Sequence, residues 1–127
     1  MLKLPVLPVP TPPLPDAERF AEQLRALAEP NRLRIIALLR DSEHCVCEIE
    51  SAMGLSQSLI SNHLRVLRRA GLVRARRDPS DARWIYYRLE PDAVEHLLAR
   101  LSRLLDLSHL DPRPVDCTPD GRPIRPP

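Results

Sequence analysis

The chain of 127 residues has little of several residue types that common folds and sites require. Aromatic residues make up only 3% of it, which argues against a β-sandwich. Its three glycines, at positions 54, 71 and 121, are isolated, so no glycine-rich phosphate loop exists. No stretch approaches the roughly 18 apolar residues that span a bilayer, and no small-residue cleavage site follows the N-terminal apolar residues. Neither a Ser-His-Asp order nor a carboxylate pair indicates hydrolysis. We therefore expect one mostly helical, cytoplasmic domain that is neither an enzyme nor a membrane protein.

Prolines, by contrast, are abundant and unevenly placed. Twelve of the fifteen lie in residues 1–15 and 112–127, a composition that predicts stiff, poorly ordered tails. We expect a Pro-rich flexible N-terminal tail at residues 1–15, a folded domain at residues 16–110 and a Pro-rich C-terminal tail at residues 111–127.

The three cysteines are a close pair, Cys45 and Cys47, and Cys117 in the C-terminal tail. An odd number with one close pair fits a reducing compartment, where thiols serve as metal ligands or redox groups and not as a disulfide framework. The pair lies just ahead of a segment that we interpret as a DNA-binding helix, which suggests soft-metal chemistry coupled to a DNA contact.

Positive charge is concentrated in one part of the chain. Residues 56–88 contain eight arginines and two aspartates, a net charge of +6, while the rest of the chain has a net charge of −4. Such asymmetry is typical of a nucleic-acid-binding face, although an arginine-rich segment can also be a solvated surface.

The apolar periodicity predicts five helices, at residues 16–28, 31–40, 46–53, 56–70 and 92–110. Asp16 is expected to cap the first, Pro30 to suit the first turn of the second, and Ser56 to cap the fourth. The third and fourth helices are separated by a tight turn at Gly54-Leu55. A helix, a tight glycine turn and a second helix predict a helix-turn-helix motif.

The fourth predicted helix has two different faces. At about 100° per residue, its polar residues fall within about 140° of one another: Gln57, Ser58, Ser61, Asn62, Arg65, Arg68 and Arg69. Uncharged hydrogen-bonding residues come first and arginines later, so the beginning of the helix can contact bases while the arginines neutralise phosphates. The opposite face is apolar and contains Leu59, Ile60, Leu64, Val66 and Leu67. His63 falls on that side, and we expect a packed histidine there, not a metal ligand.

After Gly71, residues 72–77 and 83–89 flank a turn at residues 78–81, which predicts a β-hairpin. A hairpin that follows a recognition helix is a wing. The arginines near its tip, Arg76, Arg77 and Arg83, are placed to contact the DNA backbone or the minor groove. The fold class is therefore mainly α with a small β-hairpin, a winged helix-turn-helix.

The last predicted helix carries an apolar stripe, made of Val94, Leu97, Leu98, Leu101, Leu104 and Leu105. Such a stripe requires a partner, so we expect a homodimer formed through the terminal helices. Asp92 with His96, and Asp106 with His109, have helical spacings that could form a second metal site across this dimer, although helix-surface Asp and His are usually solvated.

A resemblance extends over residues 16 to about 110 and rests on three segments. They are residues 45–49 (Cys-Val-Cys-Glu-Ile), 55–73 (from Leu-Ser-Gln-Ser to Ala-Gly-Leu-Val) and 84–89 (Trp-Ile-Tyr-Tyr-Arg-Leu). Together they resemble the ArsR/SmtB family of metal-responsive winged-helix repressors, and Cys-Val-Cys resembles its soft-metal branch. The resemblance implies that the protein binds double-stranded operator DNA and releases it when an ion binds Cys45 and Cys47. With the charge pattern, it gives a predicted DNA-contacting set of Ser56, Gln57, Ser58, Ser61, Asn62, Arg65, Arg68, Arg77 and Arg83.

The ion itself is predicted from the number of thiols. Some family members have a third cysteine where this chain has Glu50. Others have cysteines in an N-terminal arm, but the N-terminal arm of this chain contains no cysteine. Because As(III) favours three thiolates, we expect a site of Cys45, Cys47 and Cys117, with As(III) or Sb(III) as the inducer. The alternatives are that Cys117 is incidental, that Cd(II), Pb(II) or Zn(II) is sensed, that the thiols form a redox switch, or that the protein is an architectural DNA-binding module without an inducer.

The spacing of the cysteine pair also predicts a mechanism. Residues i and i+2 of a helix project about 200° apart and cannot converge on one ion. Treating Cys45 and Cys47 as helical, we therefore expect ion binding to unwind the first turn of this helix, misalign the recognition helix packed against it and lower DNA affinity.

Overall fold

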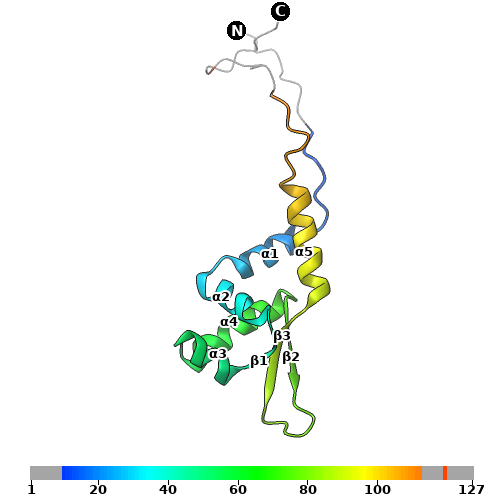
Figure 1. The fold of residues 1–127 in the computed structure, drawn as a ribbon. Helices are drawn as coiled ribbons and strands as arrows, with labels where there is room; N and C mark the ends of the chain where they lie inside the picture. Colours follow the sequence, from blue (N-terminus) through cyan, green and yellow to red (C-terminus); the bar gives the residue numbers. More distant parts are fainter. Residues whose placement is uncertain (1–9, 113–118, 120–127) are drawn as a thin grey trace, which may run out of the picture.

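Helices and a small antiparallel sheet make up the computed structural model, which describes residues 10–112 and residue 119 (Figure 1). The elements in chain order are α1 (Ala17–Leu27), α2 (Pro30–Leu39), β1 (His44–Cys45), α3 (Val46–Met53), α4 (Gln57–Arg69), β2 (Val73–Arg77), β3 (Ile85–Leu89) and α5 (Pro91–Leu104). The predicted winged helix-turn-helix class is confirmed: α3 and α4 form the motif, and β2 and β3 form the wing. Cys117 and most of both predicted tails lie outside the described residues.

Side-chain caps explain where the central helices begin. The Glu29 side chain accepts a hydrogen bond from the Arg32 N–H at 2.9 Å, and Pro30 occupies the first turn of α2. Ser56 Oγ accepts from the Leu59 N–H at 3.3 Å at the start of α4, as predicted. Asp16 lies at the N-cap position of α1, but its side chain makes no capping hydrogen bond. That prediction was wrong because a capping side chain needs an extended backbone, whereas Asp16 is left-handed with φ of 56°.

The core lies between the five helices and the base of the wing. Its buried residues are Phe20, Ala26, Ile35, Leu39, Ile49, Ile60, Leu64, Leu67, Ala70, Leu72, Val73 and Leu97. His63 is buried with them at 9% exposure, which confirms the packed histidine. Its Nδ1 lies 3.4 Å from the Arg32 guanidinium, while Arg32 Nε donates to the Ala26 carbonyl at 2.7 Å. Arg32 thus connects the recognition helix to the end of α1.

The sheet has the strand order β1-β3-β2, with both pairs antiparallel. The two-residue strand β1 was not predicted, because two residues carry no periodic pattern. It pairs Cys45 with Tyr86 and His44 with Tyr87. The segment that contains the first thiol is therefore joined by backbone pairing to the wing.

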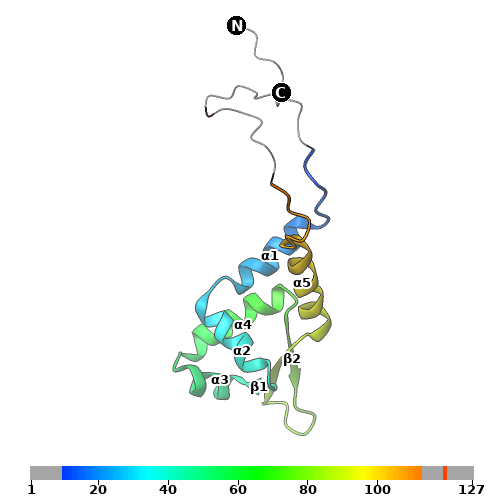
Figure 2. The same ribbon diagram turned by 45° about the horizontal axis from the view of Figure 1, so that its top comes forward.

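Helix α5 follows the wing and lies beside α1 in both views (Figures 1 and 2), with the Arg100 guanidinium 4.4 Å from the centre of the Phe20 ring. It ends at Leu104, not at the predicted residue 110. The leucines beyond it, Leu105, Leu107 and Leu110, are exposed, so no packing within the described chain supports further turns. None of the helices among the described residues is long and apolar enough to cross a membrane.

Candidate functional site: a nucleic-acid interface beside a thiol pocket

Helix α4 exposes the polar face that the sequence predicts. Ser56, its N-cap, and most polar residues of the helix are exposed, and Ser61 is partly buried: the exposed ones are Gln57, Ser58, Asn62, Arg65, Arg68 and Arg69. Ile60, Leu64 and Leu67 on the opposite side are fully buried. Leu59, which we placed on the apolar side, is 49% exposed because it lies at the edge of the buried face. We name the exposed polar side of α4 the DNA-contact face.

The wing arginines differ in how they are held. Arg76 forms a bidentate ion pair with Glu43 and lies 4.9 Å from the centre of the Tyr86 ring. This pairing lowers the pKa of Glu43. Arg77 donates to the Ala82 carbonyl at 2.8 Å. Arg76 is therefore a structural connection between the wing and the loop before β1, a role that the sequence pattern did not indicate.

Arg83 is paired within the wing tip. Its guanidinium contacts both carboxylate oxygens of Asp81, at 2.8 and 3.0 Å, and its side chain remains 88% exposed. The hydrogen bond from Arg83 lowers the pKa of Asp81. Because the pair is on the surface, a phosphate can compete with Asp81 for Arg83.

Cys45 precedes α3 instead of lying within it. Its backbone is extended, with φ of −81° and ψ of 166°, and it is the N-cap residue of the helix. The Glu48 carboxylate accepts a hydrogen bond from the Cys45 N–H at 3.1 Å, and the Cys45 sulfur faces the Glu48 N–H in return, which forms a capping box. Burial raises the pKa of Cys45, and the neighbouring Cys47 thiol raises it further.

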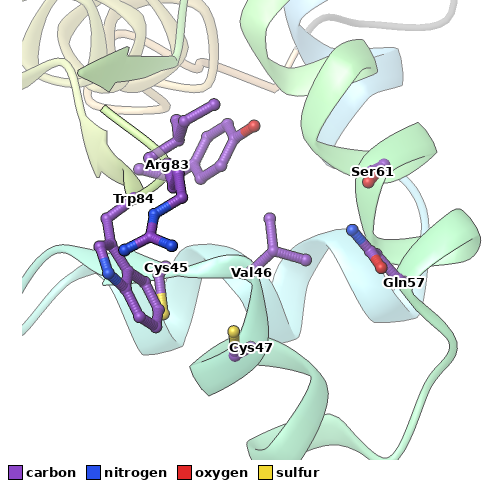
Figure 3. A pocket seen from close by; sticks show the side chains of 9 residues that line it. Cys45, Val46, Cys47, Gln57, Ser61, Arg83 and Trp84 are labelled. Carbon is purple, nitrogen blue, oxygen red and sulfur yellow. The ribbon is translucent and has the colours of Figure 1, made fainter. Parts of the chain in front are cut away.

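The two thiols line one pocket of about 570 Å³ (Figure 3). Its lining comes from β1, α3, α4, β3 and the loop before β3, and is made of Cys45, Val46, Cys47, Gln57, Ser61, Arg83, Trp84, Ile85 and Tyr87. We name this space the thiol pocket. The expectation that both cysteines project from one helix was wrong, because Cys45 has a strand backbone. Ion binding to both thiols therefore does not by itself require that α3 unwind.

The sequence did not indicate the aromatic part of this lining. Trp84 directly precedes β3. Ile85 and Tyr87 are two residues apart in β3, so they share one face of the strand, and that face lines the pocket. The period-2 alternation was visible in the sequence, but the element that faces those residues was not, because β1 was missing from the prediction.

Among residues 10–112, no three His, Cys, Asp or Glu side chains are arranged to hold a metal ion. Cys45 and Cys47 are brought together, but a third ligand is not supplied by the described part of the chain. For the second predicted site, Asp92 and His96 lie on α5, whereas Asp106 and His109 lie beyond its end. The prediction that Asp106 and His109 lie on a helix was therefore wrong. Asp106 instead accepts a hydrogen bond from the Ser108 N–H at 2.9 Å.

A helix-turn-helix with an exposed polar and basic second helix, flanked by a wing, defines a DNA-binding transcriptional regulator. Comparison with known proteins agrees: the family model described as "Bacterial regulatory protein, arsR family" matches residues 29–75. The chain belongs to this family.

Its relatives are transcriptional regulators and not enzymes. The repressor SmtB of Mycobacterium tuberculosis is 38% identical over 94 residues, which cover 74% of this chain and 67% of that protein. The arsenic resistance transcriptional regulator ArsR1 of Pseudomonas putida is 41% identical over 83 residues, which cover 65% of this chain and 62% of that protein. The solved structure of HlyU from Vibrio cholerae matches with a TM-score of 0.58 and 36% identity, covering 72% of this chain and 96% of that one.

Proposed function

We propose that this protein is a metal(loid)-responsive transcriptional repressor, which binds operator DNA as a homodimer and releases it when As(III) or Sb(III) binds Cys45, Cys47 and Cys117. The observation that carries the proposal is that Cys45 and Cys47 line one pocket together with residues of the recognition helix and the wing. The name of ArsR1, an arsenic resistance transcriptional regulator, supports a metal(loid) inducer by analogy.

The DNA-contact face supports base recognition in the major groove. Gln57, Ser58, Ser61 and Asn62 are hydrogen-bonding residues in the first half of α4, and uncharged donors and acceptors suit base edges. Arg65 and Arg68 follow in the second half, and Arg77 and Arg83 lie on the wing, where each would neutralise a phosphate. No acidic residue occurs between Ser56 and Arg77, so no carboxylate of α4 or β2 repels a phosphate.

The ion preference follows from the donors. Thiolates select soft ions, and As(III) is satisfied by three of them. Two lie in the thiol pocket, and Cys117 is the one other thiol in the sequence. A four-coordinate ion such as Zn(II) would require a further ligand in addition to these thiols, whereas a thiol redox switch would require no ion.

The dimer is proposed from the outer side of α5. Leu98 is 62% exposed and Leu105 just beyond the helix is 64% exposed, while Leu97 on the other side packs into the core. Exposed leucines beside a buried stripe indicate a surface that another chain covers. Sedimentation equilibrium tests this: Leu98→Glu should give monomers, whereas Leu33→Glu, at an exposed leucine of α2, should not.

The main test is the fluorescence anisotropy of a labelled duplex taken from DNA upstream of the protein's own gene. Arsenite, cadmium and zinc are added separately to the complex under reducing conditions. In a further experiment, an oxidant is added without reductant. Release by arsenite that is lost in Cys45→Ser, Cys47→Ser and Cys117→Ser supports the three-thiol sensor. Release by cadmium or zinc that Cys117→Ser does not affect would instead support mixed ligands, and release by oxidant alone would support a redox switch.

A further inference from the structure

We propose that Gln23 and Arg19 of α1 are positioning residues for DNA recognition: they hold the last turn of the recognition helix α4 and so fix the spacing at which a dimer reads two half-sites. The inference rests on the proposed function, because it needs a dimer that binds operator DNA. It concerns residues outside the DNA-contact face and the thiol pocket, and it does not depend on which ion is sensed.

The last turn of α4 has four backbone carbonyls, in residues 67–70, that no further turn of the helix can satisfy. The loop after the helix supplies two donors. The N–H groups of Leu72 and Gly71 donate to the first two of these carbonyls, at 3.1 and 2.9 Å. This is a Schellman motif, with Gly71 in the left-handed conformation at φ of 75°. The loop gives no donor to the last two carbonyls, those of Arg69 and Ala70.

Two side chains of α1 supply the missing donors. Gln23 Nε2 donates to the Ala70 carbonyl at 3.2 Å, and the Arg19 guanidinium donates to the Arg69 carbonyl at 3.0 Å. Gln23 and Arg19 are one turn apart, so they project from the same face of α1. All four carbonyls at the end of the recognition helix are therefore satisfied, and two of them by a different helix.

Gln23 is the buried member of this pair, at 8% exposure. A buried amide and a carbonyl that lose each other are both left unpaired, which is unfavourable, so the bond fixes where the end of α4 lies. Arg19 is more exposed, and it also pairs with Glu22 at 3.1 Å. Its positive charge suits the negative end of the α4 dipole. Gln23 thus contributes geometric precision, and Arg19 adds electrostatic attraction.

Helix α1 is in turn held by α5. Arg100 of α5 lies 4.4 Å from the centre of the Phe20 ring and donates to the Pro15 carbonyl just before α1. The same helix carries the exposed Leu98 of the proposed dimer surface. Helix α1 therefore connects the proposed dimer surface to the end of the recognition helix.

This connection bears on half-site spacing. A dimer that reads two half-sites holds its recognition helices about one turn of DNA apart. If each α4 is fixed to α1 at its last turn, a duplex with its half-sites one base pair further apart can be bound only when those hydrogen bonds break. Without them, each α4 can shift to meet the displaced half-site at a lower cost. Gln23 and Arg19 would thus contribute to specificity without touching DNA.

The experiment compares two Kd values by fluorescence anisotropy, after footprinting has located the half-sites. One is for the operator duplex, and the other is for the same duplex with one base pair inserted between the half-sites. The ratio of the two Kd values is the spacing preference. Gln23→Met keeps the length of the side chain and removes the donor. It should lower the ratio by about tenfold, the factor that corresponds to one hydrogen bond in each subunit. An unchanged ratio would overturn the proposal.

A loss of stability alone should leave the ratio unchanged, because unfolding removes protein from both complexes equally. Ile35→Val, at a fully buried residue of α2, is the matched control. It should lower the thermal midpoint, as core truncation does, and keep the wild-type ratio. If Ile35→Val lowers the ratio as much as Gln23→Met does, general loosening is the cause and the positioning role fails.

Arg19 is tested with a variant that removes its donors and one that keeps them. Arg19→Met should lower the ratio, whereas Arg19→Lys retains a charged donor and should preserve most of it. The slope of log K against log salt should stay at the wild-type value in both, because Arg19 is engaged with α4 and not with phosphate. A slope reduced by about 0.9 in Arg19→Met would make Arg19 a phosphate contact and contradict its positioning role.

The outcomes separate this inference from the proposed function. Wild-type protein that binds both duplexes equally well would overturn the spacing role, while release of operator by arsenite would still support the proposed function. A spacing preference that depends on Gln23, in a protein that no ion releases from DNA, would support the positioning role and contradict the proposed inducer.

Discussion

Glu48 accepts a hydrogen bond from the backbone N–H of Cys45 at 3.1 Å, so the proposed metal ligand is also the cap of the helix that follows it. The Cys45 hydrogen bond also lowers the pKa of Glu48, which keeps this carboxylate ionised as an acceptor. The position of the first thiol thus depends on a residue that is not itself a thiol.

Glu48→Ala removes one half of this capping box. We expect the thermal midpoint of the metal-free, reduced protein to fall by about a few degrees, because the first turn of α3 loses a charge-assisted cap. Glu48→Gln keeps an acceptor and should lose less. Circular dichroism melting checks both, with Glu50→Ala on the same helix as the control. Equal melting of Glu48→Ala and Glu50→Ala would contradict the role of the cap.

Gly71 is expected to resist substitution more strongly than Gly54. Both have positive φ, 75° and 66°, so alanine at either position costs about 1–2 kcal/mol in backbone strain. A Cβ at Gly71 would also lie 2.9 Å from the Arg19 guanidinium, whereas one at Gly54 meets nothing within 4 Å. Urea unfolding should therefore show a larger loss for Gly71→Ala than for Gly54→Ala.

The excess can be assigned by a double-mutant cycle. Arg19 also donates to the Arg69 carbonyl at 3.0 Å, so it is not free to move away without losing that bond. If crowding is the cause, the extra loss in Gly71→Ala should shrink in an Arg19→Ala background. An unchanged excess would mean that the backbone alone explains the difference.

Asp81 should contribute to stability in a pH-dependent way. Its pKa is lowered in the folded protein by Arg83, so the pair stabilises the fold above the unfolded pKa near 3.8 and is lost as pH falls through the folded pKa. We expect Asp81→Asn to melt slightly lower than the wild type at neutral pH and to match it in strong acid. Melting curves across pH test this, with Asp41→Asn as an exposed carboxylate control. A difference that persists in acid would contradict the ion-pair origin.

Arg65→Ala should weaken DNA binding mainly through phosphate. Arg65 is exposed on the second half of α4, so its loss should reduce the slope of log K against log salt by about 0.9. The measurement is anisotropy over a salt series. Arg34→Ala on α2, also exposed, is the matched control and should leave the slope unchanged. A slope that does not change in Arg65→Ala would remove Arg65 from the DNA-contacting set.

The sequence was most informative where structure depends on neighbouring residues. The bounds of α3 and α4 followed from Gly54, from the Ser56 cap and from apolar spacing, because helix formation and capping are local. It was less informative where packing decides: the apolar stripe continued to Leu110, but α5 ends at Leu104. The Asp16 cap failed for a similar reason, because φ at that residue was not fixed by the residue type.

The sequence alone therefore determined the winged helix-turn-helix, the polar and basic side of α4 and the pairing of two thiols beside it. All of these follow from residue order within one or two turns. Only the tertiary structure decided that Cys45 lies on a strand paired with the wing, and that Gln57, Trp84 and the two thiols share one pocket. Those contacts join residues up to about forty positions apart, and they form only because burial of the core brings α3, α4 and the wing together.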